Sequence, residues 1–281
     1  MSESNQNHQG PLLPTGINLF RLDGRVALVT GAYGHLGKSM AYGLAEAGAQ
    51  VIVNGRSPEK LALLASEMMG KGYKVTVASG DVTEEQDLKR VIELVTADYN
   101  CLDIIINNAY AGRTGTVATS SIGDFSQAYQ ITVTAAFRIV QLAQPLLEIA
   151  ASRLPGGASV INIASMYGMV SPDPAIYGDS GSNSPPYYGA AKAGLIQLTR
   201  YLACHLASSK IRVNCISPGP FPPPEISQNQ PAFYAELCRK NPMHRIGFSD
   251  ELKGAVLFLA SDAASYVTGV NLPVDGGWTA W

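Results

Sequence analysis

The chain has 281 residues, of which 46% are hydrophobic and 15% charged, with a formal net charge of −2. That length is ample for one large α/β domain with a sizeable core. The near-neutral charge argues against nucleic acid or an anionic membrane as the main partner, and no stretch reaches the roughly 18 apolar residues of a membrane span.

Short apolar runs then alternate with helical patterns along the chain. Strands are expected at Arg25–Thr30, Gln50–Asn54, Lys74–Ala78, Leu102–Asn107, Ser159–Ile163, Arg212–Ile216 and Val270–Val274. Helices are expected at Leu36–Ala47, Phe125–Ala151 and Tyr188–Ser208, and near Pro231–Lys240. A further helix should begin after an N-cap at Ser57 and run to Met69, and another should begin at Thr83, which has capping-box spacing with Gln86. This alternation predicts an α/β fold with a doubly wound parallel β-sheet of about seven strands, covered by helices on both faces.

The domain organisation is simple. Residues 1–17 are polar with Gly and Pro and lack a signal-peptide core, which predicts a flexible tail. Residues 18–281 show no linker and no repeat, so we expect one domain. The four cysteines form no C-x-x-C pair and no zinc spacing. We therefore expect no metal site, and reduced thiols in a cytoplasmic protein.

A glycine-rich turn, Thr30–Gly37, lies where the first strand should pass into the first helix. Glycines let the backbone approach a phosphate, and a helix N-terminus attracts its charge. The turn could be an ordinary tight connection, but the strand before it and the helix after it favour dinucleotide binding. The residues expected to line that site are Gly31, Tyr33, Gly34, His35 and Leu36.

The ends of the next two strands bear on the choice of coenzyme. The second strand ends Asn54-Gly55-Arg56, where a carboxylate would select NAD and an arginine accommodates a 2′-phosphate. Arg56 therefore favours NADP(H), with NAD(H) still possible. Asp81 and Val82 end the third strand, where Asp81 could reach the adenine amino group or could simply begin the next helix.

Tyr188 and Lys192 stand at positions i and i+4 of an expected helix, so they share one face. An ammonium group beside the tyrosine oxygen would lower the pKa of the phenol and let it exchange protons near neutral pH. The same spacing also arises by chance on surface helices, and the remaining motifs decide between these readings.

Taken in order, these motifs resemble those of the short-chain dehydrogenase/reductase family, from about residue 20 to the C-terminus. The matching segments are Thr30–Gly37, Asp81-Val82, Asn107-Asn108-Ala109, Ser165, Tyr188 with Lys192, Pro218-Gly219 and Val274-Asp275-Gly276-Gly277. The resemblance implies a Rossmann-like fold and a homo-oligomer, a tetramer or a dimer, built from the Phe125–Ala151 and Tyr188–Ser208 helices. The apolar end, Trp278–Trp281, would pack either on a partner subunit or on its own core.

The resemblance also implies residue roles. Tyr188 would be the general acid for ketone reduction or the base for alcohol oxidation, and Lys192 would lower its pKa and bind the nicotinamide ribose. Ser165 would hydrogen-bond the reacting carbonyl. The remaining contacts with the coenzyme are Asn108 and Ala109 at the adenosine ribose, and Pro218, Gly219 and Phe221 beside the nicotinamide.

Four positions depart from the family pattern. His35 replaces the middle glycine of the phosphate turn, with Gly34 one residue earlier, and Tyr110 replaces the glycine of Asn-Asn-Ala-Gly. Pro222-Pro223-Pro224 stands where many members carry a threonine that contacts the nicotinamide amide. Thr132 takes the place of a catalytic asparagine. Threonine still offers a backbone carbonyl and a hydroxyl, so we expect a slower or rearranged proton relay rather than an inactive site.

The segment between Ser165 and Tyr188 is longer than is usual in the family. It is polar and rich in turn formers, and it must pass near the substrate mouth. There Asp173, Tyr177 and Asp179 could hydrogen-bond a polar substrate, or the segment could pack on a neighbouring subunit. The expected substrate loops are residues 166–187 and 220–247.

The sequence thus predicts an NADP(H)-dependent oxidoreductase that interconverts a secondary alcohol and a ketone on a small polar substrate, such as a sugar, aminosugar or polyol. The alternatives are a 3-oxoacyl-thioester reductase, a catalytically impaired cofactor-binding regulatory protein, and an α/β interaction domain without cofactor.

Overall fold

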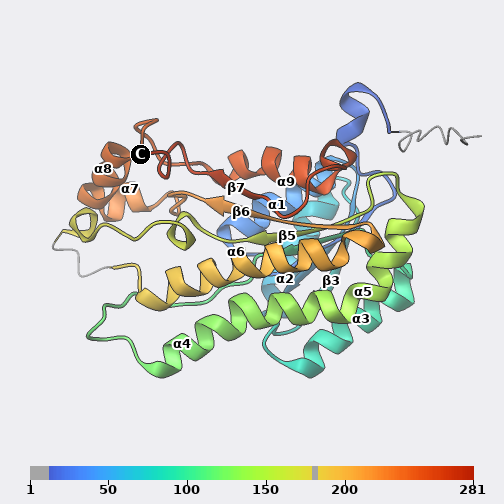
Figure 1. Ribbon diagram of the computed structural model, residues 1–281, viewed down its shortest axis with the longest axis horizontal. Coiled ribbons are helices and arrows are strands. Elements are labelled where there is room, and N and C mark those ends of the chain that lie inside the picture. Colours follow the sequence, from blue (N-terminus) through green and yellow to red (C-terminus); the bar gives the residue numbers. More distant parts are fainter. Residues whose placement is uncertain (1–12, 179–182) are drawn as a thin grey trace, which may run out of the picture.

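The computed structural model describes residues 13–178 and 183–281, so most of the predicted tail lies outside the described residues. Within these residues, parallel strands form one sheet in the order β3-β2-β1-β4-β5-β6-β7 (Figure 1). The strands are β1 Val26–Val29, β2 Gln50–Gly55, β3 Val75–Ser79, β4 Ile104–Asn107, β5 Ala158–Ile163, β6 Ile211–Pro218 and β7 Asn271–Val274. The prediction of a doubly wound parallel sheet is confirmed.

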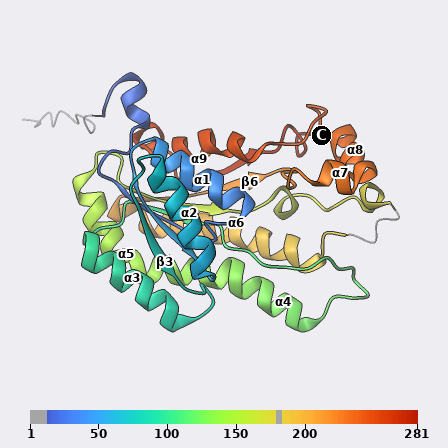
Figure 2. The ribbon, with the colours of Figure 1, turned by 180° about the vertical axis from the view of Figure 1, so that it is seen from behind.

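Helices cover both faces of the sheet. On one face lie α3 (Glu85–Tyr99), α5 (Ala135–Arg153) and α6 (Pro186–Leu206), and on the other lie α1 (His35–Glu46), α2 (Pro58–Gly70) and α9 (Leu252–Ala260), seen from behind in Figure 2. Successive strand residues alternate between the two resulting cores. Val26 and Leu28 pack with α3 and α5, while Ala27 and Val29 pack with α1 and α2. Among the described helices, none combines the length and apolar character needed to span a membrane.

Two local predictions about helices need correction. The Thr83–Gln86 capping box is wrong: α3 begins at Glu85, with Glu84 as its N-cap. Thr83 is instead held in the preceding turn, because Asp81 Oδ1 accepts from its N–H at 2.9 Å and from its hydroxyl at 2.8 Å. The single helix expected at 125–151 is divided into α4 (Ile122–Tyr129), a π-helical turn at Gln130–Thr134, and α5. Such turns open the helical hydrogen-bond ladder and are frequent at functional sites. The Ser57 cap of α2 is confirmed, because its side chain accepts from Lys60 N–H.

The strand order places the site. β1 lies between β2 and β4. The crossovers run from β1 through β2 to β3 in one direction, and from β4 to β7 in the other, so the switch point is at the carboxyl ends of β1 and β4. Ligands of open α/β sheets bind at such switch points. Two short helices follow β6, α7 (Ile226–Asn229) and α8 (Pro231–Lys240), and they lie beyond the same edge of the sheet (Figure 1).

Candidate active site

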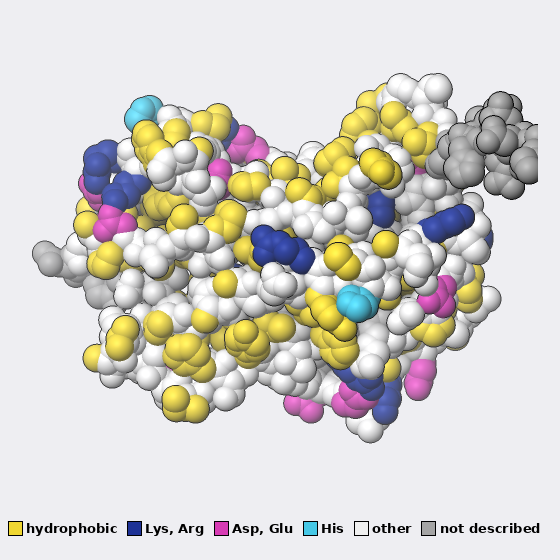
Figure 3. Space-filling model, in the orientation of Figure 1, with side chains coloured by type: hydrophobic (Ala, Val, Ile, Leu, Met, Phe, Trp, Pro, Cys, Tyr) yellow, Lys and Arg dark blue, Asp and Glu magenta, His cyan; other side chains and the backbone are white. Residues whose placement is uncertain are grey.

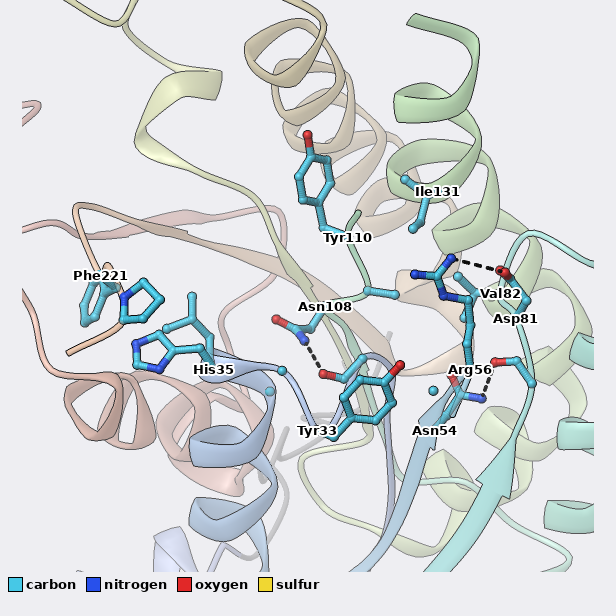
Figure 4. A pocket seen from close by; sticks show the side chains of 18 residues that line it. Tyr33, His35, Asn54, Arg56, Asp81, Val82, Asn108, Tyr110, Ile131 and Phe221 are labelled. Atoms are coloured by element: carbon cyan, nitrogen blue, oxygen red, sulfur yellow. Dashed lines mark hydrogen bonds and ion pairs between the residues drawn. The ribbon is translucent and has the colours of Figure 1, made fainter. Parts of the chain in front are cut away.

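A cleft of about 370 Å³ lies at this switch point. In Figure 4 it runs from His35 and Phe221 at one end to Arg56, Asp81 and Val82 at the other. The residues of the predicted coenzyme set that line it are Gly31, Tyr33, Gly34, His35, Leu36, Arg56, Asp81, Val82, Asn108, Ala109 and Phe221. Pro218 and Gly219 are not among its lining residues; Gly219 N–H instead donates to Val274 O at 3.0 Å, tying the end of β6 to β7.

The glycine turn has the form of a phosphate cradle. A β-carbon at Gly37 would lie 2.2 Å from Gly31 O, so only glycine permits this close passage of strand and helix. The Asn108 side chain fixes the turn by donating to Thr30 O at 3.0 Å. Helix α1 begins at His35 with Gly34 as its N-cap, and no side chain caps it and no acidic residue lies in its first turn. Its free N–H groups and positive end therefore fit a pyrophosphate.

The displaced glycine is accommodated locally. Gly34 N–H donates to Gly31 O at 3.0 Å, which closes the turn one residue earlier than the family pattern expects. His35 then becomes the first residue of α1, and its exposed side chain lines the cleft beside Phe221 (Figure 4).

The far end of the cleft carries positive charge. Arg56 Nη1 lies 3.9 Å from Asp81 Oδ2 across the mouth. The Tyr33 ring lies against Gly55, where a β-carbon would come within 2.4 Å of the ring, and Lys60 Nζ is 5.6 Å from the centre of that ring. Two cations and an aromatic surface thus surround the place where the second strand ends, which suits an anionic group on a ribose.

The predicted catalytic residues come together on β5 and α6. Ser165 follows β5 and is buried; its hydroxyl oxygen accepts from Tyr167 N–H at 3.1 Å, and a hydroxyl can donate its own hydrogen at the same time. Lys192 is 4% exposed and donates from Nζ to Ile163 O at 2.6 Å. Its Nζ lies 5.8 Å from the centre of the Tyr188 ring.

The electrostatics of this pair differ from the expectation. Burial lowers the pKa of Lys192 to about 8. Burial also raises the pKa of Tyr188, while a side-chain hydrogen bond with Ser165 acts in the opposite direction. The expected lowering of the tyrosine pKa by Lys192 is therefore absent from this structure. The reason is geometric, because the ammonium group points to Ile163 O and is itself deprived of solvent.

Thr132 lies in the π-helical turn and is buried. Its hydroxyl and Asn107 Oδ1 are buried without a hydrogen-bond partner. Both residues, with Lys192, border a small cavity next to the sheet. Unpaired buried polar atoms are costly, so this cavity is a place where a water molecule would be stabilised. The structure thus brings Thr132 to the lysine side of the site, as expected from its position in the sequence.

Tyr110 lies between the cleft and the catalytic pair. Its ring lines the cleft, meets the Tyr188 ring edge-on with centroids 4.9 Å apart, and lies 5.4 Å from Lys192 Nζ. In Figure 4 it stands apart from the other labelled residues, with its hydroxyl directed away from Asn108. Ser165, Tyr188 and Lys192 do not themselves line the cleft.

The cleft also contains residues that the sequence did not single out as coenzyme contacts: Asn54, Gly80, Ile131 and Pro223. Gly80 stands directly before Asp81, so the glycine was a usable signal for close approach at the end of β3. Pro223 belongs to the proline run that stands where many family members carry a coenzyme-contacting threonine, so its position was a usable signal. Ile131 reaches the cleft through the π-helical turn, which has no signature in the sequence.

The described part of the inserted segment packs against α8 of the same chain. Asp173 forms an ion pair with Lys240 and caps the turn at Pro174–Tyr177 by accepting from Ala175 N–H. The Tyr177 ring stacks on Phe233 of α8 at 5.4 Å. Asp173 and Tyr177 are thus engaged within the protein rather than free for a substrate, and Asp179 lies outside the described residues. Trp278 is buried together with Ile176 and Leu237 of the same chain, so the side chain packs on the protein's own core.

The parallel sheet with a phosphate turn at its switch point defines a dinucleotide-binding α/β protein. A family model described as "Enoyl-(Acyl carrier protein) reductase" matches residues 31–279. The 3-oxoacyl-(acyl-carrier-protein) reductase FabG of Thermotoga maritima is 32% identical over 92% of this chain and 98% of its own length. The chain belongs to the short-chain dehydrogenase/reductase family, and it is an oxidoreductase of that family acting on CH–OH or C=O groups.

Solved structures agree with this assignment. A gluconate 5-dehydrogenase from Burkholderia cenocepacia J2315, in complex with NADP and tartrate, has a TM-score of 0.83 and 32% identity, covering 94% of this chain and 99% of its own. The RhlG/NADP active-site complex from Pseudomonas aeruginosa has a TM-score of 0.84 and 32% identity, covering 93% and 98%.

Proposed function

We propose that the protein is an NADP(H)-dependent oxidoreductase that interconverts a secondary alcohol and a ketone on a small polar substrate of the sugar, aminosugar or polyol kind. The observation that carries the proposal is the placement of Ser165, Tyr188 and Lys192 together beside a cleft with a phosphate cradle. When bound, the nicotinamide supplies or accepts the hydride at the substrate carbon.

The chain's own residues handle the substrate oxygen and its proton. The Ser165 hydroxyl donates a hydrogen bond to that oxygen as charge develops on it. In reduction, Tyr188 gives its phenolic proton to the oxygen, and in oxidation its phenolate takes the proton back. Burial raises the pKa of Tyr188 in the coenzyme-free protein, so the Lys192 ammonium, 5.8 Å from the centre of the Tyr188 ring, acts on the phenolate only once it forms during turnover. The unpaired oxygens of Thr132 and Asn107 suit a water molecule in the small cavity beside Lys192, which would relay protons to the lysine.

The choice of NADP(H) rests on Arg56 and its surroundings. Arg56, Lys60 and Tyr33 lie around the end of β2, and no carboxylate ends that strand to bind the ribose hydroxyls. The names of two structural neighbours include NADP, which supports the same coenzyme here. Arg56→Ala should weaken NADPH binding by about tenfold or more and NADH binding by less than about threefold, because only NADPH carries the 2′-phosphate. Equal weakening of both coenzymes in a fluorescence titration would contradict the assignment.

The substrate class is supported by the gluconate 5-dehydrogenase neighbour, whereas the FabG and RhlG neighbours support a 3-oxoacyl-thioester as the second candidate. A panel of ketoaldonates, ketoses and polyols, with acetoacetyl thioesters in a parallel arm, separates the two. We expect turnover with NADPH on a polyhydroxy ketone or its alcohol. Turnover restricted to the thioester arm would establish the reductase alternative. A coenzyme-induced rise in Tm with no turnover in either arm would establish a regulatory protein.

The proposal also covers the subunit assembly and the cellular location. Apolar side chains exposed on α4, α5 and α6 include Ile122, Phe125, Tyr129, Phe137 and Tyr201. Figure 3 shows hydrophobic side chains distributed over this face. They support a homo-oligomer, a dimer or a tetramer, in which these helices meet. The cytoplasmic location predicted from the cysteines remains part of this proposal.

A further inference from the structure

Tyr110 occupies a position between the coenzyme cleft and the two residues that handle the proton. Its ring is one wall of the cleft, and the same ring contacts Tyr188 edge-on at 4.9 Å and lies 5.4 Å from Lys192 Nζ. The Lys192 ammonium therefore lies near two tyrosine rings, at 5.4 Å and 5.8 Å, with one hydrogen bond to Ile163 O. Both the edge-on pair and the cation–π contact favour this arrangement.

The backbone fits this position of the ring. A β-carbon at Gly112 would lie 2.1 Å from the Tyr110 hydroxyl, so only glycine at position 112 leaves room for that hydroxyl. The ring is half-buried, and this burial raises the pKa of Tyr110, so the phenol stays neutral. Tyr110 is therefore a neutral aromatic cover, seated against Gly112 on one side and the catalytic pair on the other.

The Tyr110 ring stands at the end of the cleft that faces the catalytic residues. The cleft reaches Tyr110, but Ser165, Tyr188 and Lys192 do not line it. Hydride and proton transfer must converge on one carbon–oxygen bond, so the nicotinamide ring must lie next to the substrate that Tyr188 protonates. With Tyr110 in its present position, the cleft ends short of that meeting point.

We propose that Tyr110 is a positioning residue that covers Tyr188 and Lys192 in the coenzyme-free protein and leaves this place when the nicotinamide ribose enters beside Lys192. The inference rests on the proposed function, because it requires a nicotinamide coenzyme in the cleft. Binding of the adenosine half needs no movement, whereas binding of the nicotinamide half must displace the ring. The apparent affinity for the whole coenzyme is then reduced by the fraction of molecules in which the ring covers the pair.

The test compares NADP⁺ with 2′,5′-ADP, which contains the adenosine half and the 2′-phosphate but no nicotinamide ribose. Dissociation constants are measured by calorimetry for the wild type, Tyr110→Gly and Tyr110→Phe. Tyr110→Gly should bind NADP⁺ about tenfold more tightly than the wild type, since it lacks the ring, and should bind 2′,5′-ADP with unchanged affinity. Tyr110→Phe keeps the ring and should bind NADP⁺ within about threefold of the wild type.

A second variant covers the case in which Tyr110→Gly fails to fold. Gly112→Ala adds a β-carbon where the Tyr110 hydroxyl now lies, so the ring should be displaced and NADP⁺ binding should again tighten while 2′,5′-ADP binding stays the same. Unchanged or weaker NADP⁺ binding in the folded variants would overturn the proposal, because Tyr110 would then be neutral or a direct support of the bound coenzyme. Failure of the wild type to bind either ligand would instead contradict the proposed function.

Discussion

At the scale of single residues, Lys192 shows how strongly burial sets the chemistry of this site. An ammonium group with 4% exposure, one carbonyl acceptor and two aromatic rings is poorly solvated, and its pKa falls to about 8. The i, i+4 spacing predicted that Lys192 and Tyr188 share a helix face, and Nζ lies 5.8 Å from the centre of the Tyr188 ring. The spacing could not predict that the ammonium would point to Ile163 O. Solvent exclusion depends on β5, β6 and Tyr110, which are distant from Lys192 in the sequence.

The lowered pKa of Lys192 makes stability depend on pH. The folded chain binds this proton less tightly than the unfolded chain, whose lysine has a pKa near 10.4, so stability rises with pH between about 8 and 10.4. Compared with Lys192→Met, which retains a long apolar stem, the wild type should gain about 2 kcal/mol of unfolding free energy between pH 7 and pH 9.5. Urea unfolding at both pH values measures this difference. Parallel pH dependence of the two proteins would show that Lys192 is not desolvated.

At the scale of elements, the insertion and α8 form one unit. The stack of Tyr177 on Phe233 and the ion pair of Asp173 with Lys240 join segments that the sequence assigned to two separate substrate loops. Ile176 and Leu237 are buried in the same small cluster. We therefore infer that residues 171–178 and α8 move as one unit, because separating them would break an aromatic stack and expose these side chains.

Phe233→Ala tests this coupling. Loss of an aromatic pair costs about 0.5–1.5 kcal/mol, so amide hydrogen exchange in residues 171–178 should accelerate by about twofold to tenfold. KM for the substrate should rise more than kcat falls, because the change loosens the proposed substrate wall and leaves the catalytic residues in place. Glu236→Ala, on the same helix and half-buried, where Glu236 pairs with Arg239, is the matched control. Exchange in 171–178 that is as slow in Phe233→Ala as in this control would mean that the insertion is held by other contacts.

These elements also show what the sequence could predict. Each buried strand was recognised because a sheet covered on both faces needs a continuous apolar run, and the glycine turn and Ser57 cap have local signatures. The π-helical turn around Thr132 was missed, because its neighbours read as one continuous helix. The sequence could not predict the side-chain orientations of Tyr110 and Tyr177, because each is fixed by residues on another part of the chain.

At the scale of the whole molecule, the two helical layers differ in their exposed surfaces. The layer of α4, α5 and α6 carries exposed aromatic side chains, among them Phe137 at 40% and Tyr201 at 56% exposure. Both helices continue into the site, α5 from the turn that holds Thr132 and α6 through Tyr188 and Lys192. An assembly built on this face would therefore restrain the elements that carry the catalytic residues.

The combined variant Phe137→Asp with Tyr201→Asp should reduce the assembly to smaller units, because a desolvated carboxylate is strongly disfavoured in an interface core. Light scattering coupled to gel filtration gives the mass. Tyr266→Asp, a change at a fully exposed position outside this layer, is the control and should leave the mass unchanged. A wild-type protein with the mass of a single chain would contradict the assembly.

The proposed mechanism requires Tyr188 to exchange the proton with the substrate oxygen, and Tyr188→Phe removes the group that does so. The variant keeps the ring that packs on Tyr110 and loses only the hydroxyl. With the substrate identified by the panel, kcat should fall by at least about 100-fold, while the dissociation constant for NADP⁺ should change by less than about threefold. Turnover close to that of the wild type would show that the Tyr188 hydroxyl does not exchange the proton.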